Sequence, residues 1–370
     1  MPNRNIFEEF TPELMTLYWR ERALPERQTY LGAALFPSAY NPDLSLSWIR
    51  GRTPAPIALN PSAFDTEPPL RSRFGYEKIT RDMPFFREAL HINEEEFMTL
   101  QRVERGLVSE SYAIPVKNKI YNDVFDLVEA GRVQKEAMRM QLLGTGGKIS
   151  VAGAHGAVYS VDYQMPEENK FVVAPGFAWS NTAAADPIED LRVWRKDIRD
   201  RVGSYPARVI LSAKTWGYIR DNQKIKNGAL LALGTVAGTA TTVDVNIPPD
   251  KYAEYIRSAL SDGAAGSGNL EFIVYDKVYK AHARASLSQY FPDDVIALLP
   301  SGTLGNTWWS DTPESLDAGN GKFETASVSD GVVVCQSRND KPPLGFEIWA
   351  SMITLPSFER ILDCGWARVV

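Results

Sequence analysis

The run Gly144-Thr-Gly-Gly-Lys148 resembles a phosphate-binding loop in composition. Such a loop requires a glycine five positions before its last glycine and a Ser or Thr directly after the lysine. Leu142 and Ile149 stand at those two positions. A bound phosphate also sits on a helix N-terminus, whereas this run follows a predicted helix and precedes a predicted strand. The sequence therefore predicts a helix stop at the glycines and no phosphate site.

The histidines give no sign of metal binding. His91, His155 and His282 are scattered, and none has a neighbour at the spacing of metal ligands such as H-x-x-x-H or C-x-x-C. His155 lies between Gly153 and Gly156, where the tip of a hairpin is the simplest interpretation. The chain also lacks the G-x-S-x-G motif that exposes a nucleophilic serine in many hydrolases.

Cysteines and paired acids are the remaining candidates for chemistry. Cys335 and Cys364 both stand in apolar, strand-like contexts, so we expect two buried thiols, as in a reducing cytosol, and no disulfide. The pair Glu189-Asp190 follows Asp186 in the first turn of a predicted helix, where carboxylates complement the helix dipole. The sequence predicts no catalytic residue, no metal and no cofactor, but an enzyme whose residues meet only in space stays open.

Composition limits the class of protein further. With 370 residues the chain is long enough for two or three domains. Its net charge of −6 argues against binding nucleic acid through a generally basic surface. The N-terminal residues contain no apolar run typical of a signal peptide, and no stretch of about 18 apolar residues occurs. We therefore expect neither a secretion signal nor a membrane span.

One long helix is the element around which the other segments are arranged. Apolar residues recur every three or four positions from Val116 to Leu143, and no proline interrupts them. Pro115 marks the start of the helix, and the glycines from Gly144 stop it. At about 1.5 Å per residue the helix is roughly 40 Å long, more than an ordinary globular domain needs. Its exposed, polar side is predicted to carry Lys119, Asn122, Asp126, Glu129, Arg132 and Lys135.

Residues 1–45 combine a short predicted helix with a proline-rich, aromatic segment. The helix runs from Pro12 to Ala23, and the prolines beyond it prevent regular helix. The aromatic residues between those prolines argue against a disordered tail. Since no partner within the chain is evident, we expect an extended arm that buries its aromatic side chains against a neighbouring subunit.

Residues 46–90 predict a long β-hairpin with a proline-rich tip. Four basic residues follow the tip, and we interpret them as a solvated or intersubunit charge set in preference to a nucleic-acid site: Arg71, Arg73, Lys78 and Arg81.

The rest of the chain alternates short helices and strands. Asn93 and Asp186 are predicted N-caps, and residues 223–250, which are small and glycine-rich, predict a loop. The predicted helices cover 97–103, 187–202, 213–221 and 248–260. The predicted strands cover 148–151, 157–163, 171–173, 208–211, 270–275, 294–299, 332–335 and 344–353.

Three local motifs, in this order, carry a resemblance to a known family. The first is Leu142-Leu-Gly-Thr-Gly-Gly-Lys-Ile-Ser-Val151 leading to Val161-Asp-Tyr-Gln-Met165; the second is Trp179-Ser-Asn followed by Asp186-Pro-Ile-Glu-Asp190. The third is Arg208-Val-Ile-Leu-Ser-Ala-Lys-Thr-Trp216. They resemble the helix-to-hairpin passage, the W-S then D-P segment and the strand–turn–helix of tailed-phage major capsid proteins, in particular the lambda-type major capsid protein E family. The resemblance covers nearly the whole chain, although residues 223–269 match nothing.

The resemblance implies an α+β chain with the Hong Kong ninety-seven type of tailed-phage major capsid fold. Its parts would be an N-terminal arm (1–45), an extended E-loop hairpin (46–90), a P-domain (91–205) with the spine helix (116–143), an A-domain (206–325), and C-terminal strands (326–370) that return to the A/P-domain core.

The implied function is that of a major capsid protein with no enzymatic activity. Copies would self-assemble as hexamers and pentamers into the icosahedral shell around the double-stranded DNA of a tailed phage. The expected partners are other copies, scaffold and portal proteins and a decoration protein, with no sequence-specific DNA contact and no membrane. The protein is expected in the virion, and in the host cytoplasm during assembly. The expected intersubunit contacts are Trp19, Tyr30, Phe36 and Tyr40 in the arm and Trp48, Ile57, Leu59 and Phe64 in the E-loop.

Two alternatives stay open at this point. The first is an encapsulin-like shell protein of a nanocompartment, which uses the same fold without a virus. The second is a soluble oligomeric α/β enzyme, which predicts a pocket with convergent polar groups and perturbed pKa values.

Overall fold

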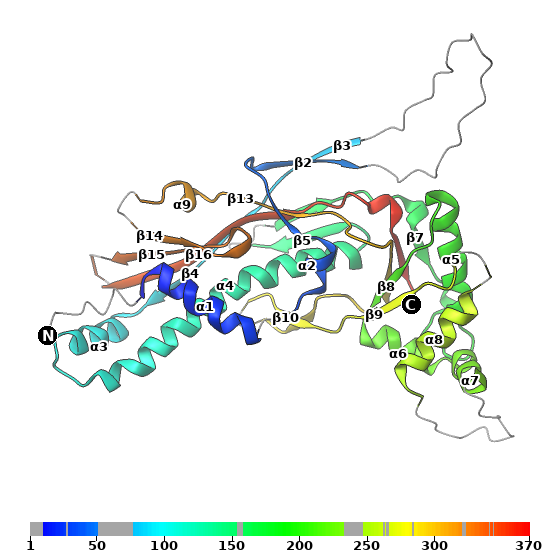
Figure 1. Cartoon of the computed structure of the whole chain (residues 1–370), viewed down its shortest axis with the longest axis horizontal. Coiled ribbons are helices and arrows are strands. Elements are labelled where there is room, and N and C mark those ends of the chain that lie inside the picture. The colour runs from blue at the N-terminus through cyan, green and yellow to red at the C-terminus, as the bar shows by residue number, and fades with distance from the viewer. Residues whose placement is uncertain are drawn as a thin grey trace, which may run out of the picture. The chain divides into compact units, whose positions relative to one another are not determined.

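The structure is a computed structural model of the whole chain (Figure 1). It describes residues 10–26, 29–50, 77–153, 158–232, 247–319 apart from 262, 264, 265, 283 and 284, and 323–370 apart from 340 and 343. The chain forms two compact units, each built from separate segments. Unit 1 comprises Met1–Ser47, Thr80–Ala137 and Asn306–Ser357; unit 2 comprises Trp48–Ile79, Met138–Gly305 and Phe358–Val370.

Unit 1 contains a six-stranded sheet centred on the long strand β16 (Gly345–Pro356). One edge of β16 pairs antiparallel with β4 (Phe85–Ile92). Its other edge pairs antiparallel with two strands in succession, first with β15 (Val333–Asn339) along residues 345–351 and then with β13 (Thr307–Ser310) along residues 353–356. β14 (Glu324–Ser327) extends the sheet beyond β15, and β1 (Ser38–Tyr40) pairs parallel with β13. The N-terminal segment therefore contributes the strand β1 to this sheet.

Helices cover one face of that sheet. They are α1 (Pro12–Glu26), α3 (Glu94–Glu104) and α4 (Ala113–Gly144), the last of which contributes residues to both units. The short helix α2 (Leu31–Leu35) is attached to α4. Alternate side chains of a strand point to one face, so Phe346, Ile348 and Met352 of β16 all enter the core that packs on Ile120 and Val124 of α4. The Asn93 side chain caps α3 by accepting from the backbone N–H of Glu96 at 2.9 Å, as predicted.

The long helix is confirmed, but its polar side is not. α4 has 32 residues, somewhat more than the predicted span. Lys135 and Glu136 are 3% and 0% exposed. Glu136 accepts from the Gly32 N–H in the segment that contains α2, and the Lys135 ammonium donates to the carbonyl of Asp330. The prediction of an exposed polar side is therefore wrong for the part of the helix around these residues.

The predicted hairpin is present at its base, where β2 (Ser45–Arg50) pairs with β3 (Glu77–Asp82). Its tip lies outside the described residues.

Unit 2 has a five-stranded sheet in the order β7 (Lys170–Val172), β17 (Gly365–Arg368), β12 (Val295–Leu299), β8 (Arg208–Leu211), β9 (Glu271–Val274). The central strand β12 is buried along its whole length. Two hairpins accompany this sheet, namely β5 (Lys148–Ala152) with β6 (Val158–Asp162) and β10 (Val278–Lys280) with β11 (Leu287–Gln289).

Four helices complete unit 2: α5 (Pro187–Val202), α6 (Ala213–Asp221), α7 (Gln223–Ala232) and α8 (Pro249–Leu260). α5 begins and ends where the sequence predicts, because Asp186 accepts from the N–H of Glu189 and Gly203 takes the left-handed conformation at φ 87°. The predicted loop at 223–250 is wrong in its first part, which forms α7. The short helix α9 (Pro313–Leu316) belongs to unit 1. Single 3-10 turns lie at Glu110–Tyr112, Glu167–Asn169, Pro175–Phe177, Ser329–Gly331 and Ile361–Asp363.

A buried arginine fastens the loop before β9 to α5. Arg195 is 2% exposed, and its guanidinium donates to the carbonyl oxygens of Ser267 at 2.6 Å and Asn269 at 3.2 Å. Weaker contacts reach the carbonyls of Pro206 and Gly266. One fixed fork of donors thus holds two chain segments that have no regular structure of their own.

We predict that Arg195→Met lowers the free energy of unfolding by about 2–4 kcal/mol, since it leaves buried carbonyl groups without their donor. Urea unfolding of the unassembled subunit measures this loss. Lys196→Met is the matched control, because Lys196 is the next residue of the same helix and is exposed. Equal stability of the two variants would contradict the role given to Arg195.

Candidate functional site

The glycine run after α4 is a helix cap. The N–H of Gly147 donates to the carbonyl of Leu142 at 2.8 Å, and Gly146 and Gly147 have φ values of 69° and 89°. The Trp366 indole N–H donates to the carbonyl of Gly144 at 2.8 Å. Carbonyl groups at a helix C-terminus repel a phosphate, so the prediction that this run is no phosphate site agrees with its geometry.

The thiols are buried, as predicted. Burial raises the pKa of Cys335 to about 12, and it raises the pKa of Cys364 further. Both therefore stay protonated and unreactive at neutral pH. Among the residues that the structure describes, no three His, Cys, Asp or Glu side chains form a group that could hold a metal ion. No described helix is long and apolar enough to span a bilayer.

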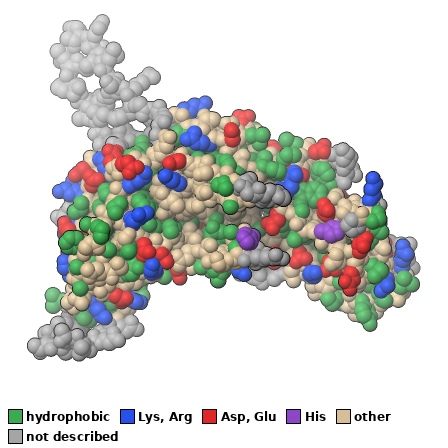
Figure 2. Space-filling model, turned by 180° about the vertical axis from the view of Figure 1, so that it is seen from behind, with side chains coloured by type: hydrophobic (Ala, Val, Ile, Leu, Met, Phe, Trp, Pro, Cys, Tyr) green, Lys and Arg blue, Asp and Glu red, His purple; other side chains and the backbone are tan. Residues whose placement is uncertain are grey.

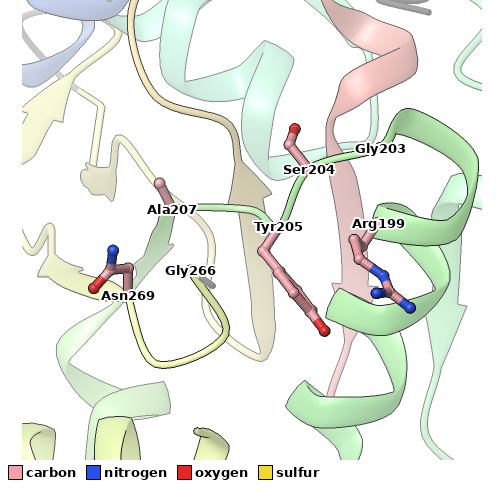
Figure 3. Close-up of a pocket in the computed structure, with 7 residues that line it drawn as sticks. All are labelled: Arg199, Gly203, Ser204, Tyr205, Ala207, Gly266 and Asn269. Atoms are coloured by element: carbon pink, nitrogen blue, oxygen red, sulfur yellow. The ribbon is translucent and has the colours of Figure 1, made fainter. Parts of the chain in front are cut away.

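The enzyme alternative requires a pocket, and unit 2 has one of about 470 Å³ beside the Arg195 fork (Figure 3). Its polar side chains are Arg199, Ser204, Tyr205 and Asn269. Arg199 lies 5.3 Å from the centre of the Tyr205 ring and forms an ion pair with Asp200 at 2.6 Å. The residues described as lining this pocket include no histidine, cysteine or carboxylate, the usual general bases. The pocket gives no support to a hydrolytic or proton-transfer site.

The N-terminal segment is attached to α4 of its own chain by several side-chain contacts. The hydroxyl of Tyr30 donates to Glu129 of α4 at 2.9 Å, and Arg132 donates to the other oxygen of that carboxylate at 2.9 Å. The Arg132 guanidinium also lies 5.2 Å from the centre of the Tyr30 ring. One turn further along α4, Glu136 accepts from the backbone N–H of Gly32 at 2.9 Å. The N-terminal segment therefore packs on the side of α4 that the sequence predicts to be exposed to solvent.

Backbone pairing continues the attachment toward β13. The Thr307 N–H donates to the carbonyl of Pro37 at 2.8 Å, and the Asn41 N–H donates to the carbonyl of Trp309, also at 2.8 Å. The Thr307 hydroxyl donates to the carbonyl of Phe36 at 3.0 Å. Phe10, just before α1, and Trp19 of α1 enter the core shared by α4 and the sheet. The expectation that this segment has no partner within the chain is thus wrong for its described residues.

The eight expected contact residues fall into three groups. Three of them lie outside the described residues: Ile57, Leu59 and Phe64. Four are buried by their own chain: Trp19, Tyr30, Phe36 and Trp48. Tyr40 is 46% exposed, with its ring 4.8 Å from that of Trp309 and its hydroxyl donating to Asp311 at 2.6 Å.

Apolar side chains exposed on helices were not among those candidates. Leu14 and Leu17 are 43% and 50% exposed on the outer side of α1, although Met15 beneath them is fully buried. Met98, Tyr112 and Ile114 are similarly exposed on α3 and around the start of α4. The sequence did contain a signal for an interface at α1, because a helix with apolar residues on both sides requires a packing partner on each side.

Charged side chains do not gather into a basic field on the face that Figure 2 shows. Blue and red side chains are interspersed there between apolar ones. This face therefore resembles a surface for protein contact more than one that attracts a phosphate backbone.

Comparison with known proteins points to one family. The family model for phage major capsid protein E matches residues 14–361. Among solved structures, a protein assigned as the capsid protein of an E. coli CFT073 prophage matches with a TM-score of 0.59 at 14% identity, covering 97% of this chain and 99% of that chain. A phage-related protein of Bordetella bronchiseptica RB50 matches with a TM-score of 0.50 at 15% identity, covering 97% of each chain. No curated protein sequence matches. At such low identity the two structures show a shared fold and nothing finer.

Truncation of two aromatic residues of the N-terminal segment is expected to destabilise the subunit to different extents. Phe36→Ala should lower the free energy of unfolding by about 3–4 kcal/mol, since Phe36 is fully buried. Tyr40→Ala should cost about 1 kcal/mol, because it removes one hydrogen bond and a half-exposed ring. Urea unfolding of the unassembled subunit measures both values. Similar losses for the two variants would show that the burial described for this segment is wrong.

Proposed function

Because the chain belongs to the phage major capsid protein E family, it is a structural subunit of a phage head, and we propose that copies of it join as hexamers and pentamers into an icosahedral shell around double-stranded DNA. The predicted tailed-phage major capsid fold is confirmed. The observation that carries the proposal is the extent of the family match. It runs from α1 almost to the last strand, and thus includes parts of both units.

The pairing of β2 with β3 supports an E-loop within residues 46–90, and the single helix α4 supports a spine within a P-domain at 91–205. The five-stranded sheet with α6 and α8 supports an A-domain within residues 206–325, and β17 of the C-terminal strands 326–370 returns to that sheet by pairing with β12. The other C-terminal strands, β15 and β16, pair in the six-stranded sheet of unit 1, together with β13 and β14. The arm at 1–45 differs from the expected kind of arm, because its described part is attached to its own subunit.

We assign the contacts between copies by exposure. The exposed residues Tyr40, Leu14 and Leu17 are proposed to touch neighbouring subunits directly. The E-loop residues Ile57, Leu59 and Phe64 lie outside the described residues and are proposed for the same role from the sequence alone. The buried residues Trp19, Tyr30, Phe36 and Trp48 are proposed to act indirectly, by fixing the segments that carry the contact residues. Many small contacts of this kind sum over a closed, symmetric shell.

Other partners follow from the same role. Scaffold and portal proteins are proposed partners during assembly in the host cytoplasm, and a decoration protein is a proposed partner of the finished shell. The DNA inside is proposed to be enclosed without base-specific contacts, in keeping with the net charge of −6. The subunit is proposed to have no catalytic role.

The two alternatives are less well supported. A nanocompartment shell would use the same fold, but the matching family is one of phage capsids. An enzyme would require a reactive group in the unit 2 pocket, whose described lining residues offer no general base.

Electron microscopy of the purified protein, alone and with its scaffold protein, tests the proposal directly. We expect closed shells of uniform diameter. A compact monomer at high concentration under every assembly condition would count against the capsid role.

The proposed contact at α1 has a sharper test. Leu17→Glu should leave the stability of the subunit unchanged within about 0.5 kcal/mol, because the side chain is half exposed. The same change should reduce the yield of shells at least severalfold, since a charge would be buried between copies. Sedimentation velocity separates shells from subunits, and Leu17→Met is the matched control that should assemble normally. Normal assembly of Leu17→Glu would remove this residue from the interface.

A further inference from the structure

A groove of about 420 Å³ lies in unit 1 on the face of the sheet opposite to α4. Its floor is formed by side chains of β4, β15 and β16, and its walls by α9 with the residue after it and by Phe323, which directly precedes β14. Apolar and acidic side chains share the lining, among them Trp349, Phe323, Pro313, Ala89, Glu347 and Asp317.

The register of the sheet leaves Trp349 and Glu347 uncovered. Trp349 lies between Ala89 of β4 and Cys335 of β15, so small neighbours flank the indole on both sides. Glu347 lies between Ser337 of β15 and His91 of β4. Phe323 meets the indole of Trp349 edge-on, with the ring centres 5.7 Å apart and an angle of 63°. This contact fixes the indole while its free surface remains part of the groove.

The wall of the groove is held by an internal ion pair. Glu314 of α9 is 5% exposed, accepts from the Ser351 hydroxyl at 3.0 Å and pairs with Arg87. Burial alone would raise the pKa of Glu314, but the hydrogen bonds from its backbone, Ser351 and Arg87 outweigh it and lower the pKa. The charge of Arg87 is thereby compensated by Glu314 within the wall of the groove.

The carboxylate of Glu347 stays available for a further partner. Its side chain is 47% exposed, and the Nδ1 atom of His91 lies 3.9 Å from one of its oxygens. That distance is beyond a hydrogen bond. A fixed indole beside an open carboxylate suits a flat cation, since a guanidinium can stack on the ring and donate two hydrogen bonds to the acid.

The chain itself contains a segment with the matching chemistry. Arg71 and Arg73 stand two residues apart, the spacing that places both on one side of an extended chain, and they are followed by Phe74 and Tyr76. We propose that the groove of one subunit binds residues 71–76 of a second copy, with an arginine against Trp349 and Glu347. The proposal rests on the assembly of copies proposed above. This contact would give Arg71 and Arg73 a protein partner. The groove itself would not bind a DNA backbone, because its carboxylates repel phosphate.

A peptide of residues 69–76, carrying a fluorescent label, tests the groove without assembly. It should bind the dilute, full-length subunit, and Glu347→Gln and Trp349→Ala should each weaken binding about two- to fivefold. Glu88→Gln is the matched control, since Glu88 is an exposed glutamate that stands between the groove-lining residues Arg87 and Ala89 on β4 and so belongs to the other face of the sheet. Equal binding by a peptide with both arginines replaced by glutamate would overturn the proposal.

A charge swap tests the same contact in the shell. Glu347→Arg alone, and Arg71→Glu with Arg73→Glu, should each reduce the yield of shells seen by electron microscopy, and a mixture of the two variants should restore it. Restoration only when all three changes stand in one chain would show that the segment occupies its own subunit. Shells at full yield from every variant would overturn the inference and leave the capsid role intact, whereas absence of shells from the wild-type protein would count against that role.

Discussion

The carboxylate of Glu136 lies in the interior of unit 1, where loss of water costs a charged group several kcal/mol unless donors replace it. One such donor is the backbone N–H of Gly32. The segment that carries Gly32 must therefore lie on α4, and this requirement fixes the direction in which the chain continues. Phe36 then enters the core, and β1 meets β13 in parallel. The long helix serves as a support with two covered sides, one for the sheet and one for the N-terminal segment.

Local chemistry was sufficient to predict the elements whose ends are determined by their own residues. The limits of α5 follow from Asp186 and Gly203, since a side-chain cap and a left-handed glycine act within one turn. The end of α4 follows in the same way from Gly144 and the glycines behind it. The fold was then predicted from three motifs that occur in the same order as in phage major capsid proteins, because these motifs lie at the ends of helices and strands of that fold.

What could not be predicted depends on contacts between distant parts of the chain. Nothing near Glu136 in the sequence indicates that it is buried, because its partner stands 104 positions away. The groove around Trp349 is equally hard to predict, because it forms where β4, β16, α9 and Phe323 come together from separate parts of the sequence. The helix α7 is a different case, because its N-cap is local: Asn222 accepts from the N–H groups of Lys224 and Ile225. The sequence therefore contained the signal for this helix, although the glycine-rich residues after it favoured the prediction of a loop.

The parallel pairing of β1 with β13 also has a consequence for the order of synthesis. Ser38 pairs with Thr307, so the partner strand leaves the ribosome more than 260 residues after the segment that needs it. At about 5–20 residues per second this delay is roughly 15–50 s, during which Trp19 and Phe36 have no complete core to enter. A protein made in the large numbers that a shell requires would thus pass through a stage in which many nascent chains expose aromatic side chains at once.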